Sequence, residues 1–401
     1  MKKQLMALLI TVCAVFSVQS QTVQNYTSGH YSFTYPDGFQ GIEAVAESFN
    51  LYWNVFNGVF RFNPDPALHV NRVVILQNKK NFDDYISSRI GETRNEFLFL
   101  KYKNPELSEL VLFMSDAADP SSPSFSGPSL NRQLFLQFLY SFVSEPPIWI
   151  RDGFQAYFEK LTYEPKTKEM NFNPNSAWLE AAKNLKADPV RALNIEQLLS
   201  ALTGSYESSQ LYPQAWSFIS FLMNTEIGEY RLYLCEACMN LEGTLNYNEN
   251  TQQKNTDALK NRFYRFNSPE QCDIDFTAWL SFQYTFAELM QSGVTQYNEG
   301  KYALARLALT NAAHIRSDDP MLVYYLGLVS YAEKDYASAD AWYHKALEYG
   351  ADTSTVNWAL GLSAYADKRW TEAKTYLEAA KTINPARYTD KAAKLLNSMP
   401  K

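Results

Sequence analysis

The pattern of apolar and polar positions predicts a mixed set of elements in the N-terminal part of the chain. Alternating aromatic and polar residues at 29–39 (GHYSFTYPDGF) predict a strand that ends in a Pro-Asp-Gly turn. Apolar residues recur at helical spacing over 42–56, and β-branched residues at 70–76 (VNRVVIL) predict a buried strand. The other elements predicted before residue 115 are a short helix opening at 82–86 and strands at 96–102 and 107–114.

The stretch 129–159 (SLNRQLFLQFLYSFVSEPPIWIRDGFQAYFE) predicts two helices with a break between them. Apolar residues recur at i, i+3 and i+4 over 134–143, which is typical of a buried helix. Pro146 and Pro147 end this helix, since proline lacks the backbone N–H that would continue it. A second helix begins directly afterwards and carries Asp152 in its first turn.

The pattern past residue 159 predicts helices separated by breaks. Periodic apolar positions predict several helices and no further strand before the repeats described below. These helices are expected at 176–185, 195–201, 213–224, 230–241 and 257–263.

Residues 286–397 repeat with a period of 34 residues. This period resembles the tetratricopeptide repeat (TPR), in which each unit is a pair of helices with small residues at their crossing and a large one at the turn. The resemblance implies three repeats closed by a helix over 386–399. Five columns of the repeat are in register: Gly293, Gly327 and Gly361; Tyr297, Tyr331 and Tyr365; Tyr302, Tyr336 and Trp370; Ala305, Ala339 and Ala373; Ala312, Ala346 and Ala380.

In the register of that family, the first helix of each pair lines a concave wall. The side chains there are aromatic and apolar, and such a groove suits a peptide or a helix of another protein. The alternative is a purely structural stack, whose groove is covered by the upstream domain or by the final helix. The residues expected to line the groove are Met290, Val294, Tyr297, Tyr324, Leu328, Tyr331, Trp358, Leu362 and Tyr365.

The stretch 129–159, with its P-x-W-I-x-D-G-x-x-x-Y sequence from Pro147 to Tyr157, resembles the gluzincin metallopeptidases, in particular the bacterial peptidase-MA-like families. In active members, H-E-x-x-H on the first helix supplies two zinc-binding histidines and the general base, and the glutamate of W-L-x-E-G is the third zinc ligand. Aligned without gaps, the motif falls on Gln133, Leu134 and Gln137, with Trp149 and Asp152 at the tryptophan and third-ligand positions.

The resemblance implies a gluzincin-like α+β domain, with a small sheet lobe plus a helical lobe, over roughly 29–282. It also implies that the strand over 107–114 lies nearest to the active helix and pairs with an extended peptide. Without the histidines and the base, no metal-bound water is activated. We therefore expect no catalytic residue, metal or cofactor, and interpret the five aligned residues as a vestigial cleft. The alternative is an atypical hydrolase with a site centred on Asp152.

The N-terminus resembles a secretory signal peptide. Lys2 and Lys3 precede an apolar run over 5–18, and small residues precede a cleavage point after Ser20. This pattern predicts export from a bacterial cell, to the periplasm or outside. A lipoprotein site at Cys13 is the disfavoured alternative. No later run reaches the roughly 18 apolar residues of a spanning helix, so no membrane span is predicted.

The net charge limits the classes of partner to expect, and the cysteine content limits the chemistry. The formal charge of −7 disfavours nucleic acid or an anionic membrane as a partner, because phosphate binding needs a basic face. In an oxidising compartment one disulfide with a thiol left over is expected among Cys235, Cys238 and Cys272, and spacing does not decide the pair. A metal or redox role for the Cys-x-x-Cys pair is the alternative.

Together these patterns predict a signal peptide at 1–20, a degenerate peptidase-MA-like domain at 21–282, and an all-α TPR solenoid at 286–401. The function we expect is that of an exported, non-catalytic scaffold. Its partner is a protein or peptide bound in the groove of the repeats.

Overall fold

The computed structural model describes residues 23–63, 70–114, 125–164, 166–241, 250–265 and 267–400. They fold as two compact units. The N-terminal unit holds the described residues up to 173 together with 188–274, and the C-terminal unit holds 174–187 together with 275–400. The predicted signal peptide, residues 1–20, lies outside the described residues.

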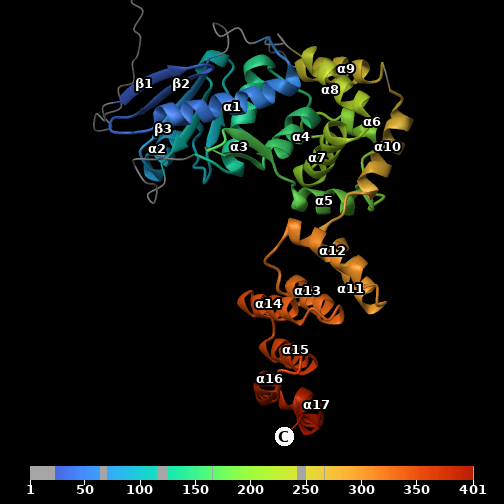
Figure 1. Ribbon diagram of the computed structural model, residues 1–401. Coiled ribbons are helices and arrows are strands. Elements are labelled where there is room, and N and C mark those ends of the chain that lie inside the picture. The colour runs from blue at the N-terminus through green and yellow to red at the C-terminus, as the bar shows by residue number, and fades with distance from the viewer. Residues whose placement is uncertain are drawn as a thin grey trace, which may run out of the picture. The chain divides into compact units, whose positions relative to one another are not determined.

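The N-terminal unit begins with a five-stranded mixed sheet in the order β1-β2-β3-β5-β4 (Figure 1). The three inner strands run parallel, whereas β1 and β4 are antiparallel to their neighbours and form the two edges. The strands are β1 (Val23–Ser28), β2 (Tyr31–Pro36), β3 (Asn71–Leu76), β4 (Leu98–Leu100) and β5 (Glu109–Phe113).

Strand β5 lies inside the sheet, which overturns one expectation. The strand predicted over 107–114 was to pair with an extended peptide, but β5 is hydrogen-bonded to β3 on one side and to β4 on the other. Both sides of its backbone are therefore occupied. The apolar pattern predicted the strand correctly but carries no information on strand order, which depends on contacts distant in sequence.

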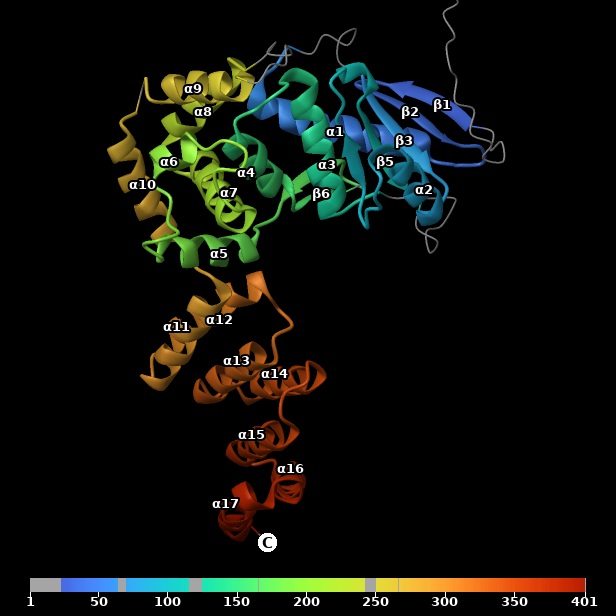
Figure 2. The same ribbon diagram turned by 180° about the vertical axis from the view of Figure 1, so that it is seen from behind.

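Helices cover both faces of the sheet (Figures 1 and 2). Phe33 on β2 packs against Phe49 of α1 (Ile42–Phe60), with ring centroids 5.6 Å apart. Side chains of successive strand residues point to opposite faces. Val111 of β5 accordingly packs with Phe82 of α2 (Lys79–Ile90) on the other face.

An aromatic core forms where α1 meets the two helices of the 129–159 stretch, α3 (Pro128–Phe142) and α4 (Ile148–Phe158). Phe56 of α1 lies 4.8 Å from Phe158 of α4, and Phe60 lies 4.9 Å from Phe154, measured between ring centroids. These rings are fully buried. Packing of this kind is worth more than its buried area alone, so it fixes α3 and α4 against the sheet lobe.

The remainder of the N-terminal unit is mostly helical, with one hairpin that the sequence pattern did not predict. The hairpin consists of β6 (Leu161–Glu164) and β7 (Glu169–Phe172), which pair antiparallel. Besides the short 3-10 helix η1 (Pro105–Leu107), the helices are α6 (Ile195–Leu199), α7 (Ser208–Asn224), α8 (Gly228–Met239) and α9 (Thr251–Phe263), and α10 (Pro269–Ser281) crosses the boundary between the units.

Gly153 permits the close packing of α4 on α7. A Cβ atom at this position would lie 2.7 Å from Cγ1 of Ile219 and 2.9 Å from the carbonyl oxygen of Ala215. Any larger residue would force the two helices apart.

The C-terminal unit consists of three helix pairs and a final helix, and Figure 2 shows the pairs in succession. In each pair, the glycine of the 34-residue period lies where the first helix crosses the second. A Cβ atom at Gly293, Gly327 and Gly361 would lie 2.6, 2.5 and 2.8 Å from Leu309, Tyr343 and Leu377, respectively. The helices are α11 (Phe286–Asn298), α12 (Tyr302–Ile315), α13 (Pro320–Ala332), α14 (Tyr336–Glu348), α15 (Thr353–Ala366), α16 (Trp370–Ile383) and α17 (Pro385–Ser398).

The turn inside each pair also repeats. Gly300, Lys334 and Lys368 follow one another at 34-residue intervals, and all three adopt the left-handed conformation, with φ of 74°, 67° and 62°. An aromatic contact accompanies each turn, such as Tyr331 against Tyr336 at 5.8 Å between ring centroids. The sequence period is thus a period of backbone conformation as well.

Helix α5 (Ser176–Lys186) belongs to the C-terminal unit although it lies far upstream of the repeats in sequence. The ammonium group of Lys183 pairs with Glu288 at 2.6 Å and donates to the carbonyl oxygen of Gln283 at 2.7 Å. The structure thereby adds α5 to the part of the chain that the sequence assigned to 286–401.

At the level of class, the chain is a small mixed sheet followed by a long run of helices, as expected. None of the helices in the described residues is both long enough and apolar enough to cross a membrane.

Candidate functional site

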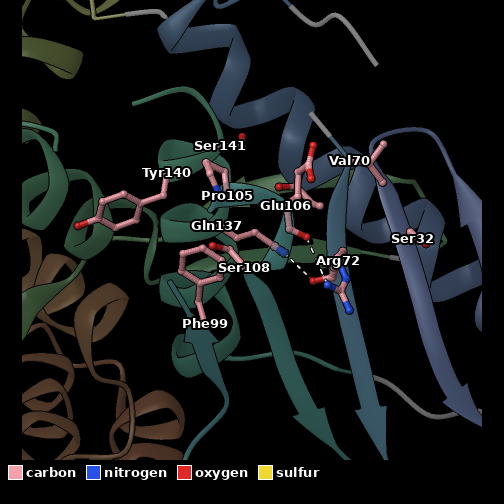
Figure 3. Close-up of a pocket in the computed structure, with 11 residues that line it drawn as sticks. Ser32, Val70, Arg72, Phe99, Pro105, Glu106, Ser108, Gln137, Tyr140 and Ser141 are labelled. Carbon is pink, nitrogen blue, oxygen red and sulfur yellow. Dashed lines mark hydrogen bonds between the residues drawn. The ribbon is translucent and has the colours of Figure 1, made fainter. Parts of the chain in front are cut away.

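Gln133 and Gln137, at the two histidine positions of the motif, bind the sheet with their side-chain amides. The Gln133 Oε1 atom accepts the backbone N–H of Phe99 on the edge strand β4 at 2.9 Å. The Gln137 Nε2 atom donates to the carbonyl oxygen of Arg72 on β3 at 2.7 Å, as Figure 3 shows. Residues four apart share one helix face, so the two amides fasten one side of α3 to the sheet.

Leu134 and Trp149 are core residues. Both side chains are fully buried. The ring of Trp149 packs against Phe218 of α7, with centroids 5.8 Å apart. The position of the general base is therefore occupied by an apolar side chain in a protein interior and offers no proton acceptor to a cleft.

Asp152 is buried and bound by its neighbour in sequence. The Arg151 guanidinium donates from Nε to Oδ1 at 2.5 Å and from Nη2 to Oδ2 at 3.0 Å. Burial raises the pKa of the Asp152 carboxyl, and the bonds from Arg151 and Tyr212 offset part of this rise. Because both oxygens already accept hydrogen bonds from a cation, the carboxylate is not available as a metal ligand in this arrangement.

A polar network surrounds this ion pair. The Tyr212 hydroxyl donates to Oε1 of Gln155 at 2.9 Å, and burial raises the pKa of Tyr212 to about 12. Tyr140 of α3 interacts with Arg151. Tyrosine and arginine thus hold Asp152 in place, and no water-activating group faces it among these partners.

The five predicted cleft residues therefore divide into three groups. Gln133 and Gln137 bind the sheet, Leu134 and Trp149 lie in the core, and Asp152 lies in its ion pair. Over the part of the chain that the structure describes, no group of three His, Cys, Asp or Glu side chains is arranged to hold a metal ion.

One cavity of about 410 Å³ adjoins Gln137 at the end of the sheet (Figure 3). Most of the residues that line it have polar side chains, among them Arg72, Glu106 and Tyr140. In Figure 3 the Tyr140 ring points away from the other labelled side chains, and Arg72 is bonded to the carbonyl oxygen of Glu106 at 3.3 Å. No pattern in the sequence indicates this cavity, since its wall combines residues from three strands, the 3-10 helix η1, helix α3 and the adjoining loops.

A second cavity, of about 300 Å³, lies in the C-terminal unit and coincides with the predicted groove. Of the nine predicted groove residues, Met290, Val294 and Tyr365 are not part of its wall. Met290 packs with the first two helix pairs, and the Tyr365 hydroxyl is bonded to that of Ser398 in α17 at 2.8 Å. The predicted residues that line the cavity are Tyr297, Tyr324, Leu328, Tyr331, Trp358 and Leu362.

Helix α17 forms part of the wall of this groove cavity. From the sequence, the final helix was expected only to close the stack or, in the alternative, to cover the groove. Tyr388 stacks on Trp358, with ring centroids 5.1 Å apart and an angle of 22° between the ring planes. Arg387 donates from Nη1 to the Thr355 hydroxyl at 3.1 Å. Arg387 and Lys391 both line the cavity, together with the previously unassigned Tyr343, Thr355 and Ala359.

The groove cavity combines aromatic walls with positive charge. Burial raises the pKa of Tyr324 to about 12, and burial also raises the pKa of Tyr297 and Tyr331, so these rings carry neutral hydroxyls near pH 7. None of the described residues that line it is acidic, and its two charged residues are Arg387 and Lys391. This arrangement can bind an aromatic or apolar group next to an anion.

The cysteines are buried, and the predicted disulfide is not present between the closest pair. Cys235 and Cys238 lie three residues apart on α8 as free thiols, and burial raises the pKa of both. Cys272 is likewise buried. The raised pKa keeps the thiols of Cys235 and Cys238 protonated and unreactive, which fits a packing role.

No protein-family model matches the chain, and no sequence among the curated proteins matches it significantly.

Proposed function

We propose that the protein is a non-catalytic interaction scaffold in the envelope of a bacterial cell. Its N-terminal unit is a gluzincin-like domain without the catalytic residues, and its C-terminal unit is a TPR stack that binds a peptide segment of a partner protein. At the N-terminus, Lys2 and Lys3 followed by the apolar run over 5–18 favour export to the periplasm or the outside.

The repeated geometry of the C-terminal unit supports the TPR assignment. Glycine meets a large side chain at the crossing within each helix pair, and the turn in each pair has the same left-handed conformation. Stacks of this kind bury their apolar faces only against neighbouring repeats and present a continuous concave surface.

The state of the motif positions supports the absence of peptidase activity. A catalytic zinc needs about three protein ligands and an open position for water. Here two amides bind backbone groups of the sheet, and the one carboxylate is bonded twice to Arg151.

The observation that carries the binding proposal is the aromatic cavity of about 300 Å³ at the predicted groove positions. Aromatic residues in concave pockets are the side chains that most often dominate the energy of a protein interface. Most of the tyrosine and tryptophan side chains of this wall are also only half-buried, so they leave apolar surface that a partner would bury.

The test is a selection from a random peptide library displayed on phage, with the chain from residue 21 to 401 as bait. We expect enriched peptides whose binding is weakened at least tenfold by Tyr324→Ala and by the milder Leu362→Gln. The matched control is Phe282→Ala, because Phe282 is exposed in the same unit and is not part of the cavity wall. Thermal unfolding identifies variants that fail to fold. Enriched peptides that bind all variants equally, or no enrichment at all, would refute the proposal.

A further inference from the structure

The polar side of α17 carries a row of cations beside the groove cavity. Arg387, Lys391 and Lys394 follow one another at i, i+4 and i+7, so they share one face of the helix. Arg387 and Lys391 line the cavity, and Lys394 lies about one turn further along. The helix contains one acid, Asp390, whereas the whole chain has a formal charge of −7. The row is therefore a local positive feature on an acidic protein.

These cations are not neutralised by neighbouring carboxylates. Over the described residues, none of the three lies within 4.0 Å of an acidic side chain. Arg387 does act on Asp352, whose pKa is lowered first by its bonds to Thr355 and Ser354 and least by Arg387. Exposed cations that are not in an ion pair can pair with an incoming anion without first breaking one.

The volume and the aromatic wall of the groove cavity suit one flat, apolar group. Its volume of about 300 Å³ is at the lower end of the range for small-ligand sites, which is roughly 300–1,000 Å³. One aromatic side chain fits such a volume, whereas a whole helix face does not. Tyrosine and tryptophan rings on the wall favour stacked or edge contacts with another ring.

We infer that the partner presents an aromatic side chain followed closely by several carboxylates, within one extended segment. The ring enters the cavity between Tyr324 and Trp358, and the carboxylates lie along Arg387, Lys391 and Lys394. A row of three cations spans about 10 Å of helix, seven residues at about 1.5 Å each. This length matches a series of acidic side chains better than the single carboxylate at the end of a chain. The inference rests on the proposed function.

The carboxylates and the aromatic ring of the ligand are expected to contribute unequally to the affinity. Exposed ion pairs are individually weak and are screened by salt, so replacing all carboxylates of the segment should weaken binding about three- to tenfold at low ionic strength. Removing the ring should weaken it more, because anchors buried in a pocket carry most of the binding energy.

The test uses four fluorescent octapeptides and the chain from residue 21 to 401, with affinity measured by fluorescence anisotropy. Three peptides are acetylated and amidated, so that their ends carry no charge. They contain one phenylalanine followed by three aspartates, by three asparagines or by three lysines. The fourth is the asparagine peptide with a free C-terminal carboxylate. We expect the aspartate peptide to bind tightest, the lysine peptide weakest, and the advantage of aspartate to shrink as salt rises from 20 to 500 mM.

Charge variants locate the effect on the protein. Lys391→Gln and Arg387→Gln should reduce the preference for aspartate over asparagine, and Lys374→Gln should not, since Lys374 is an exposed cation on α16 away from the cavity wall. All three are surface substitutions that leave the core untouched, so unfolding does not obscure the result.

The outcomes distinguish this inference from the proposed function. Equal affinity for the aspartate and asparagine peptides, or the same preference in Lys391→Gln, would overturn the inference while peptide binding stands. If the free-carboxylate peptide equals the aspartate peptide, the cations recognise a chain end instead of an acidic segment. If none of the octapeptides binds while library-selected peptides still bind in a Tyr324-dependent way, the inference fails and the proposed function stands. If the library selection also gives no binder, the proposed function itself fails.

Discussion

The backbone N–H of Phe99 donates to the side-chain oxygen of Gln133 at 2.9 Å. Phe99 lies on β4, an edge strand whose free backbone groups are the natural place for an added peptide strand. At this residue the donor is already used by a side chain of α3. Gln133 thus occupies, at this point, the edge-strand donor with which an added peptide strand would otherwise pair.

Introducing the peptidase motif should not create a metal site. The triple substitution Gln133→His, Leu134→Glu and Gln137→His should lower the free energy of unfolding by several kcal/mol, because a glutamate at the fully buried position 134 loses its hydration. We expect no stoichiometric zinc by mass spectrometry, since Asp152 is held by Arg151. The double substitution that keeps Leu134 is the control for the cost of the buried acid. One zinc per chain in the triple variant would contradict the view that Arg151 keeps Asp152 from a metal.

The Arg151–Asp152 pair is expected to be structural. Asp152→Ala leaves the guanidinium partly buried without its partner, which should cost about 3–5 kcal/mol in the free energy of unfolding. Replacing both residues, with Arg151→Met and Asp152→Leu, should recover a large part of this loss. The comparison is made by urea denaturation followed by circular dichroism. Asp84→Asn, which breaks an exposed pair with Lys80, should cause no measurable change. A double variant as unstable as Asp152→Ala would show that the network around the pair, and not the unpaired charge, matters.

The helix crossings in the repeats should not tolerate a methyl group. Gly327→Ala places a Cβ atom 2.5 Å from the ring of Tyr343, and the strain should cost about 1–3 kcal/mol. Gly228→Ala is the matched control, because that helical glycine has no atom near its Cβ position. Thermal unfolding followed by tryptophan fluorescence compares the two. Equal midpoints for both variants would mean that α13 and α14 can separate without cost.

Alkaline pH should destabilise the groove in a way that depends on Tyr324. Burial raises the pKa of this hydroxyl to about 12, whereas in the unfolded chain it ionises near its ordinary value of about 10. The unfolded state therefore loses its proton first, and stability falls as pH rises from 10 towards 12. Tyr324→Phe should make the unfolding free energy less dependent on pH in this window. The slope of this free energy against pH should change by up to the equivalent of about one bound proton. Denaturation midpoints at half-unit steps from pH 9 to 12 provide the measurement, and an unchanged slope would count against the buried hydroxyl.

The repeats could be predicted from sequence because their geometry recurs. A glycine that meets a large side chain at each crossing imposes the same small residue every 34 positions, so Gly293, Gly327 and Gly361 are visible without a structure. The face of each first helix follows from the same register, which is why six of the nine groove residues line one cavity.

The elements that were missed lack such a signal. Strand β7 (Glu169–Phe172) is largely exposed, so no alternation of apolar and polar residues marks it. Tyr388 and Arg387 lie on a helix outside the repeat, and no periodicity indicates that they reach Trp358 and Thr355. The pairing of Asp152 depends on the side-chain conformation of the residue next to it, which sequence spacing does not encode.

The left-handed turn at Gly300 is filled by lysine in the next two repeats, at Lys334 and Lys368. Since residues other than glycine reach this conformation at a cost of roughly 1 kcal/mol, both lysines leave room for improvement by a single exchange. The connections between the pairs do not repeat in this way, since Gly350 has a φ of 90° whereas Arg316 and Asn384, at the equivalent positions after the first and third pairs, have φ of −151° and −136°. A single helix pair is thus a unit of constant shape, and differences in curvature along the stack arise where one pair joins the next.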